Sequence, residues 1–428
     1  MKKFFRQQFT KNLAVWIMLP VVFLLSSCED EVVTTYSYRT QVPVLLKVNS
    51  FREAEIVIEP AKQLESPGKI YIFGDFLFIS EPDKGIHILD NTNPASPRNL
   101  NFINIPGTAD LAINSDVLYA DNYVDLLAFD ISDPRDIKLI KRETDVFPNL
   151  YSNEETGTII IYKDTLITST EEDMMMGHWG RPAIRIDFMT DRAFTNFSSA
   201  SKNSSGGQSY GQGGSMARFT LLNNHLYAVD DHNLRVFDVS APADPNFVKE
   251  VSLGWGIETI FPFDNKLFIG SMTGMFIYDA SDPAAPTQMS HYAHVTACDP
   301  VVVNEKYAFV TLRSGVACRM GVDELHILDI QNPYKPILLK SYPMENPHGL
   351  GLAGEHLYLA EGKFGLKSYD VSNVMSIIPV EHLADFRSVD IIPGPKSLIV
   401  IGPDGVCQFN YTQKNKLEKL SCITVGIQ

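Results

Sequence analysis

One stretch of the chain recurs about every forty residues, and its copies align on an aspartate that closes a short apolar run. The clearest anchor aspartates are Asp90, Asp130, Asp238, Asp279, Asp329 and Asp370. In the regular parts of the chain, neighbouring anchors lie 40, 41 or 50 positions apart. The best copy, residues 218–256, holds four short apolar runs separated by Asn, Asp, Gly and Pro, a pattern typical of strands joined by tight turns. A period of this length predicts a repeat architecture.

Four antiparallel strands per forty residues make one blade of a β-propeller. A single blade cannot bury both of its faces, so the blades must stack in a ring. The sequence therefore predicts an all-β propeller of eight blades, covering residues 69–107, 108–148, 149–217, 218–256, 257–295, 296–347, 348–386 and 387–425. The third is distorted, with Asp187 as its anchor, and fills the gap of 108 positions between Asp130 and Asp238. If this stretch is not a full blade, the ring has seven.

The copies carry a second signature, an anchor followed by a corner such as Ile131-Ser132-Asp133-Pro134. These copies resemble the LVIVD-repeat family of bacterial β-propeller lipoproteins, and the resemblance covers residues 43–428. Three segments are similar to segments of its Bacteroidota members, namely 67–71, Gly213–Phe219 and Asn346–Gly351. The resemblance implies an exported, lipid-anchored propeller. It implies no substrate and no catalytic residues.

Residues 1–27 are predicted to be a lipoprotein signal peptide, because a basic start precedes the apolar run Leu13–Leu25. Small residues then lead to Cys28, and the resemblance implies cleavage before Cys28 and lipid attachment to it. An ordinary signal peptide or an anchor helix is the alternative, although the apolar run is short for a membrane span. Residues 28–60 are expected to form a tether and a packing segment, and 61–428 the propeller.

The acidic tract Glu29–Glu31 resembles a surface-export signal, so we expect an outer membrane lipoprotein exposed at the cell surface. The alternative is a solvated linker on a lipoprotein that faces the periplasm. The net charge of −15 argues against nucleic acid as a partner. The remaining partners are the membrane, through the lipid anchor, and an unknown protein, glycan or small ligand. We expect a monomer.

Four cysteines follow Cys28, and an even number in an exported chain predicts disulfides. Three pairings are possible among Cys298, Cys318, Cys407 and Cys422. Cys298–Cys318 would link two parts of one blade, and Cys407–Cys422 would join neighbouring strands of the last. Buried free thiols are the alternative. The spacings do not predict a zinc site.

The innermost strands line the channel of a propeller, and aligned copies place one polar residue at the start of each. This candidate ring at the channel mouth consists of Asp110, Arg218, Glu258, Asp299, His348 and Asp390. Crowded carboxylates recruit cations, so the ring could bind calcium or a cationic ligand. Alternatively, these side chains hold water and cap the ends of strands.

Three functions fit this sequence. The first is a non-enzymatic scaffold that binds its partner on the face of the channel mouth. The second is a carbohydrate-active hydrolase or lyase, with the carboxylates of the ring and His348 as acid and base groups. The third is a metal-stabilised adhesion component of the cell surface. Motifs of serine hydrolases, zinc proteases, EF-hands and P-loops are absent from the sequence, which favours the scaffold.

Overall fold

The computed structural model describes residues 35–147, 156–170, 212–294, 300–314, 322–413 and 416–426. The chain divides into two compact units, one of residues 1–42 and 163–184 and one of residues 43–162 and 185–428. Strands β1 (Thr35–Lys47) and β11 (Thr158–Thr170) pair in a two-stranded sheet that has residues in both units. Among the described residues, no helix has the length and apolar content to cross a bilayer.

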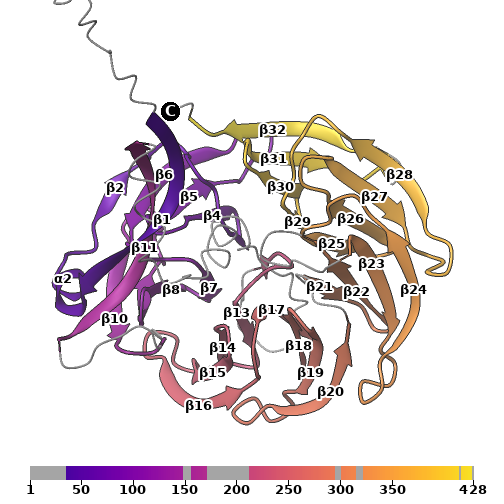
Figure 1. Ribbon diagram of the computed structural model, residues 1–428, viewed down its shortest axis with the longest axis horizontal. Coiled ribbons are helices and arrows are strands. Elements are labelled where there is room, and N and C mark those ends of the chain that lie inside the picture. The colour runs from indigo at the N-terminus through magenta and orange to yellow at the C-terminus, as the bar shows by residue number, and fades with distance from the viewer. Residues whose placement is uncertain are drawn as a thin grey trace, which may run out of the picture. The chain divides into compact units, whose positions relative to one another are not determined.

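The second unit is a seven-bladed β-propeller, in which each blade is an antiparallel meander of four strands (Figure 1). Blades 1 to 3 are β3 (Ile70–Phe73), β4 (Phe76–Glu81), β5 (Gly85–Asp90), β6 (Arg98–Asn104); β7 (Leu111–Asn114), β8 (Val117–Asn122), β9 (Asp125–Asp130), β10 (Lys138–Glu143); and β13 (Phe219–Leu222), β14 (His225–Val229), β15 (Asn233–Asp238), β16 (Asn246–Ser252). Blades 4 and 5 are β17 (Ile257–Phe263), β18 (Lys266–Ser271), β19 (Gly274–Asp279), β20 (Thr287–Ala293); and β21 (Val301–Val303), β22 (Tyr307–Leu312), β23 (Glu324–Asp329), β24 (Ile337–Pro343). Blades 6 and 7 are β25 (Leu350–Ala353), β26 (His356–Ala360), β27 (Leu366–Asp370), β28 (Ile378–Leu383); and β29 (Asp390–Pro393), β30 (Leu398–Gly402), β31 (Gly405–Asn410), β32 (Glu418–Thr424).

The prediction of eight blades is wrong, because the described residues between 149 and 217 do not form a blade. Their strand-like stretch is β11, which pairs with β1 instead of with a strand of the ring. The two-residue strand β12 (Gln212–Gly213) pairs with β3 of blade 1. The proposed anchor Asp187 lies outside the described residues. Seven blades, the alternative reading of the long gap between anchors, is the correct count.

The anchor aspartates end the third strand of each blade and fix the corner that follows. Asp130 Oδ1 accepts the backbone N–H of Ser132 at 2.9 Å, and Asn410 of blade 7 accepts that of Thr412 at 3.1 Å. The register between the third and fourth strands shifts in all seven blades. A bulge of this kind bends and twists the outer strand, which lets it follow the curve of the ring. The repeated aspartate is therefore a structural residue.

Carbonyl groups of six of these corners also connect neighbouring blades, because each of the six accepts a hydrogen bond from the blade before it. The donors and acceptors are Asn101 Nδ2 to Pro134 O (3.1 Å), Tyr119 Oη to Pro242 O (2.7 Å), Tyr227 Oη to Pro283 O (2.8 Å), Ser290 Oγ to Pro333 O (2.6 Å), Tyr342 Oη to Val374 O (2.9 Å) and Ser421 Oγ to Pro94 O (2.6 Å). The last bond joins blade 7 to blade 1 and closes the ring.

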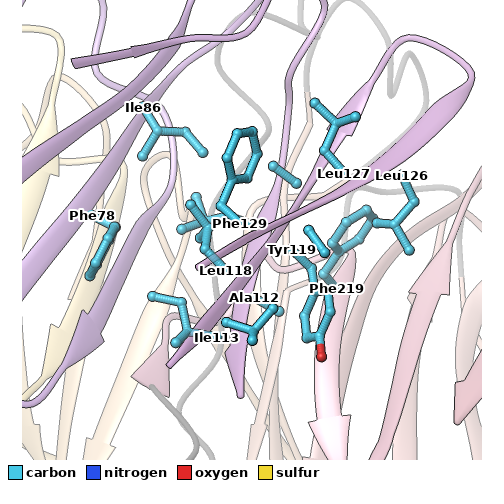
Figure 2. Close-up of a cluster of buried hydrophobic side chains, with 14 of the residues drawn as sticks. Phe78, Ile86, Ala112, Ile113, Leu118, Tyr119, Leu126, Leu127, Phe129 and Phe219 are labelled. Atoms are coloured by element: carbon cyan, nitrogen blue, oxygen red, sulfur yellow. The ribbon is translucent and has the colours of Figure 1, made fainter. Parts of the chain in front are cut away.

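The apolar core lies between the blades. Figure 2 shows Phe78 and Ile86 of blade 1, Leu118 and Phe129 of blade 2 and Phe219 of blade 3 within one buried cluster. These side chains alternate along their strands with side chains on the other face, so each blade presents two apolar faces to its neighbours. The ring buries both faces of every sheet, as the repeat predicts.

The N-terminal segment of the second unit packs on the outer side of the first two blades. Strand β2 (Ile58–Pro60) pairs with β6, and helix α2 (Val48–Arg52) places Phe51 against Tyr123 with ring centroids 5.0 Å apart. Arg52 forms an ion pair with the buried Asp125 at 2.6 Å. Blade 7 has four strands of its own, so the ring closes without a strand from this segment.

A disulfide joins the two outer strands of blade 7. Cys407 of β31 and Cys422 of β32 are direct partners in the antiparallel register, and their sulfurs are bonded. This bond is the cross-strand pair that the sequence suggests. Cys298 and Cys318 lie outside the described residues.

Candidate functional site

The first strands of all seven blades begin on one face of the ring, which we call the mouth face. The predicted ring residues lie at equivalent places on it: Asp110 directly precedes β7, Arg218 directly precedes β13, Glu258 is the second residue of β17, His348 lies two residues before β25 and Asp390 begins β29. Asp299 lies outside the described residues, and so does Cys28. The repeat therefore placed these residues on the correct face, although it did not identify their partners.

The chain itself passes through the middle of the ring. Residues Gln212–Arg218, here the channel segment, begin with β12, in which Gln212 lies opposite Ile72 of β3. The side chain of Gln212 donates to the carbonyl of Pro393, at the end of the first strand of blade 7, at 3.1 Å. Because β3 and β29 both begin at the mouth face, the segment starts deep between them and runs toward the mouth. Polar groups that line the channel thus bind the channel segment of the same chain.

Ser215 is the central residue of the channel segment and bonds two blades at once. Its hydroxyl donates to Asp390 Oδ1 of blade 7 at 3.1 Å and accepts the backbone N–H of Leu350 of blade 6 at 2.9 Å. Gly349 permits this arrangement, since a Cβ at that position would collide with the Asp390 carboxylate. The glycine of the Asn346–Gly351 motif is therefore needed for close approach of two blades.

Asp110 is buried and binds groups from the two neighbouring blades. Its Oδ2 lies 2.5 Å from the Lys69 ammonium of blade 1 and accepts the backbone N–H groups of Arg218 and Phe219 of blade 3 at 2.6 and 2.9 Å. Burial lowers the pKa of Lys69, and the adjacent carboxylate opposes that shift. Both members of the pair are almost fully buried, so Asp110 serves as a structural cap where the channel segment enters β13.

A second set of carboxylates, which the sequence analysis missed, caps the loops before the first strands. In three blades an acid at the end of the second strand accepts two consecutive N–H groups: Glu81 from Glu65 and Ser66, Asp121 from Ala109 and Asp110, and Glu361 from Glu345 and Asn346. Each acid stands nine positions before its anchor aspartate, a spacing that could have identified it. Burial raises the pKa of Asp121 to about 6. Burial also opposes ionisation of Glu81, but the His87 ring and the two N–H donors hold its pKa at about 2.

His348 is enclosed by its own blade. Its Nε2 lies 3.0 Å from Asn346 Oδ1, so Nε2–H donates and Nδ1 carries the lone pair. That Nδ1 is buried and has no hydrogen-bond partner among the described residues. Burial, with a smaller effect of the Arg313 charge, lowers the pKa of His348 to about 3. A histidine that is neutral and inaccessible at neutral pH is poorly suited to acid–base catalysis.

Among the described residues of the mouth face, the most exposed aromatic group is Trp255, in the loop between blades 3 and 4. Its side chain remains 49% exposed. It stands between Gly254 and Gly256, whose φ values of 114° and 75° favour glycine. The loop is fixed to the β14–β15 turn, since the N–H of Ile257 donates to the carbonyl of Asp231 at 3.1 Å. A rigid loop therefore presents an indole to solvent on the mouth face.

Charged side chains of the predicted ring accompany this loop. Arg218 forms an ion pair with Asp231 at 3.1 Å, and both side chains are partly exposed. Burial opposes the charge of Arg218, but Asp231 and Glu258 raise the pKa of its guanidinium. Asp231 and Glu258 lie on the turn and the strand next to the Trp255 loop, and we call Arg218, Asp231, Trp255 and Glu258 together the indole patch.

The described part of the chain has no group of three or more His, Cys, Asp or Glu side chains placed to hold a metal ion. Within the predicted ring, Asp110 and Asp390 are only 1% and 2% exposed, and each is bonded to the channel segment. The geometry at these two positions favours the alternative that the sequence left open, in which the polar residues cap the starts of strands.

Comparisons with known proteins agree with this fold. The sequence model of the LVIVD repeat matches residues 67–102, 213–252 and 296–343, which include most of blades 1, 3 and 5. The chain contains LVIVD repeats. The second match begins inside the channel segment, so that segment belongs to the repeat-bearing sequence. A search of the curated proteins found no significant match.

Solved structures of propellers are similar in fold and distant in sequence. A functionally unknown protein from Desulfotomaculum acetoxidans aligns with a TM-score of 0.50 and 10% identity over 82% of this chain and 95% of that chain. A protein from Lactobacillus plantarum gives 0.50 and 11% over 84% and 96%. The periplasmic gluconolactonase of Pseudomonas aeruginosa gives 0.50 and 11% over 84% and 97%. At these identities the likeness shows the fold alone.

Replacing Ser215 by alanine should destabilise the ring, because the buried N–H of Leu350 loses its acceptor and Asp390 loses a donor. We expect the free energy of unfolding to fall by about 1–3 kcal/mol. Ser252→Ala, at an exposed position of β16, is the matched control and should change it by less than about 0.5 kcal/mol. Chemical denaturation of the two variants measures both values. Equal stability of the two variants would show that the channel segment does not hold the blades together.

His348 should make the protein less stable in acid. Above pH 6.5 the imidazole is neutral in both states and contributes nothing. Below that value the unfolded chain takes up the proton first, because the folded pKa is lowered to about 3. The stability should therefore fall by about 1.4 kcal/mol per pH unit from this group between these limits. His348→Gln should show a shallower loss in denaturant titrations across pH 3–7, and identical slopes would contradict the assignment.

Proposed function

We propose that this protein is an exported, lipid-anchored propeller that acts as a non-enzymatic binding scaffold, and that its partner docks on the indole patch of the mouth face. The single observation that carries the proposal is Trp255, half exposed between two glycines on a loop that backbone hydrogen bonds hold in place. Exposed indoles with neighbouring charged groups are enriched where proteins bind ligands.

The chemistry of the indole patch favours a glycan or another ring-bearing polar ligand. An indole offers a flat apolar face on which the C–H face of a sugar ring can stack. Arg218, Asp231 and Glu258 supply hydrogen-bond donors and acceptors beside it. A site for a small ligand usually combines an apolar or aromatic surface with a few polar groups around it.

The alternative, a hydrolase or lyase, has less support. Hydrolysis of a glycosidic bond requires two carboxyl groups about 5–10 Å apart that substrate can reach. Asp110 and Asp390 are buried in structural bonds, and His348 has its free nitrogen inside the protein. The fold shared with a gluconolactonase does not transfer its reaction, because propellers host many functions.

Trp255→Ala should weaken glycan binding by about tenfold or more, since loss of a stacked aromatic anchor removes upwards of about 1.4 kcal/mol. The measurement is a glycan array followed by calorimetry with the best saccharide, on protein beginning at Glu29. Tyr334→Ala, at an exposed aromatic on the opposite face, is the control and should bind like the parent.

Two results would reject the glycan site: no saccharide binds the parent protein, or Trp255→Ala binds as well as the control. Release of a cleaved or ring-opened product during calorimetry would support the enzymatic alternative instead. Capture of a protein that Trp255→Ala fails to bind would retain the indole patch and change the class of partner.

The lipid anchor is proposed from the sequence. A basic start, an apolar run and small residues before Cys28 support cleavage and acylation, as in the Bacteroidota lipoproteins that the motifs resemble. Two or more acyl chains would hold the protein stably to a membrane. Glu29–Glu31 supports placement in the outer leaflet of the outer membrane.

Cys28→Ser should abolish incorporation of labelled palmitate and move the protein out of the membrane fraction, because the thiol that receives the lipid is gone. Ser252→Ala is the control, since it changes an exposed residue far from Cys28, leaves the disulfide of blade 7 intact and should keep the label. Protease treatment of intact cells then separates a surface location from a periplasmic one. Label that persists in Cys28→Ser would contradict the anchor.

A further inference from the structure

Two neighbouring blades carry large apolar side chains on corners that lie in water. These corners join the third and fourth strands of blades 5 and 6, on the face opposite the mouth. In blade 5, Tyr334 is 67% exposed and Ile337 is 52% exposed, and in blade 6, Met375 is 54% and Ile378 is 59% exposed. Exposed apolar groups that gather in one place mark contact surfaces more often than single ones do.

The repeat shows that these residues are not required by the corner. Tyr334 and Met375 stand five positions after their anchors, and Ile337 and Ile378 stand eight positions after them. The equivalent pairs in blades 1 to 4 are Ala95 and Arg98, Arg135 and Lys138, Ala243 and Asn246, and Ala284 and Thr287. Small or polar residues therefore form the same turn. Only a role outside the turn explains why blades 5 and 6 expose apolar groups here.

One side chain of the outer strand of blade 5 is hydrogen-bonded to the corner of blade 6. Tyr342 of β24 donates its hydroxyl to the carbonyl of Val374 at 2.9 Å and accepts the N–H of Ile377 at 3.2 Å. Figure 1 shows β24 and β28 as neighbouring outer strands of the ring. The blade 6 corner thus lies against the strand that follows the blade 5 corner, and we call the four apolar side chains of these two corners the corner surface.

Lysines surround the apolar residues of blade 5. Lys306, Lys335 and Lys340 are exposed, and none forms an ion pair within the described part of the chain. The nearby turns also expose Glu305 and Glu355, and the partly exposed Asp329 and Asp370 end the strands before the two corners. In a chain with a net charge of −15, a cluster of unpaired lysines beside apolar groups complements an anionic, apolar partner.

We propose that the corner surface lies on an anionic lipid surface, with the apolar residues at the headgroup boundary and the lysines on lipid phosphates. Aromatic and aliphatic side chains flanked by lysine are the usual composition of interfacial membrane contacts. The inference rests on the proposed function through the anchor. The stretch from Cys28 to Val42 reaches at most roughly 50 Å, which keeps the propeller near the bilayer. At that effective concentration a weak contact suffices.

The orientation follows from the topology of a blade. Corners between third and fourth strands and starts of first strands lie on opposite faces of an antiparallel meander. A propeller that rests on its corner surface therefore directs the indole patch away from the membrane, toward soluble partners.

The test uses protein that begins at Glu29 and so carries no acyl chain, which makes it independent of lipidation at Cys28. Binding is measured by flotation with vesicles of phosphatidylcholine alone and of an equal mixture with phosphatidylglycerol. We expect the parent to bind the mixture, less tightly as salt rises. The combined variant Tyr334→Ser, Ile337→Ser, Met375→Ser and Ile378→Ser should bind about tenfold less.

A matched control replaces four other exposed apolar residues, with Leu139→Ser, Ile140→Ser, Phe247→Ser and Val248→Ser in the outer strands of blades 2 and 3. It should bind vesicles like the parent. Three results would overturn the proposal: the parent does not bind the anionic vesicles, the control loses as much binding as the corner variant, or binding to phosphatidylcholine alone is equally tight. A fourth contradicting result would come from sedimentation velocity. If the parent dimerises and the corner variant does not, a second copy of the chain occupies the surface.

Discussion

Each sheet of this protein has two apolar faces, and no sheet can exclude water from both without a neighbour on either side. The ring satisfies that constraint seven times, and side chains such as Phe78, Phe129 and Phe219 fill the spaces between the sheets. Apolar contact alone is not directional. Hydrogen bonds are directional, and six of the corner carbonyls accept one from the preceding blade. The bond from Ser421 to Pro94 extends the series across the closure of the ring.

Passage of the chain through its own ring changes the meaning of the polar residues there. In an open channel lined by acids, the carboxylates would repel one another or bind cations. Here the channel segment supplies backbone N–H groups to Asp110 and a hydroxyl to Asp390, and Lys69 neutralises Asp110. These carboxylates, which the sequence offered as candidate acid and base groups, thus stabilise the channel segment in the middle of the fold. The side chains of the mouth face that a ligand can reach therefore lie on the loops at its rim.

In a repeat protein the departures from the repeat are more informative about function than the repeat itself. The anchor aspartates and their corners recur because every blade needs the same turn. Two exposed apolar features do not recur from blade to blade. They are Trp255, on a glycine-flanked loop, and the apolar corners of blades 5 and 6, and exposing them to water costs free energy. They lie on opposite faces, which suits a scaffold that contacts one partner on each side.

The sequence by itself determined the strands, the turns and the face on which Asp110, Arg218, Glu258, His348 and Asp390 lie, because local periodicity sets these properties. The positive φ angles of Asn223, Asn224 and Asp264 follow from the same local rules. The number of blades and the partners of the polar residues were decided only by the tertiary structure. β11 has the composition of a blade strand yet pairs with β1, and Ser215 meets Asp390 across 175 positions of chain. A strand or a carboxylate accepts any partner of suitable geometry, and the choice among them is made when distant segments pack.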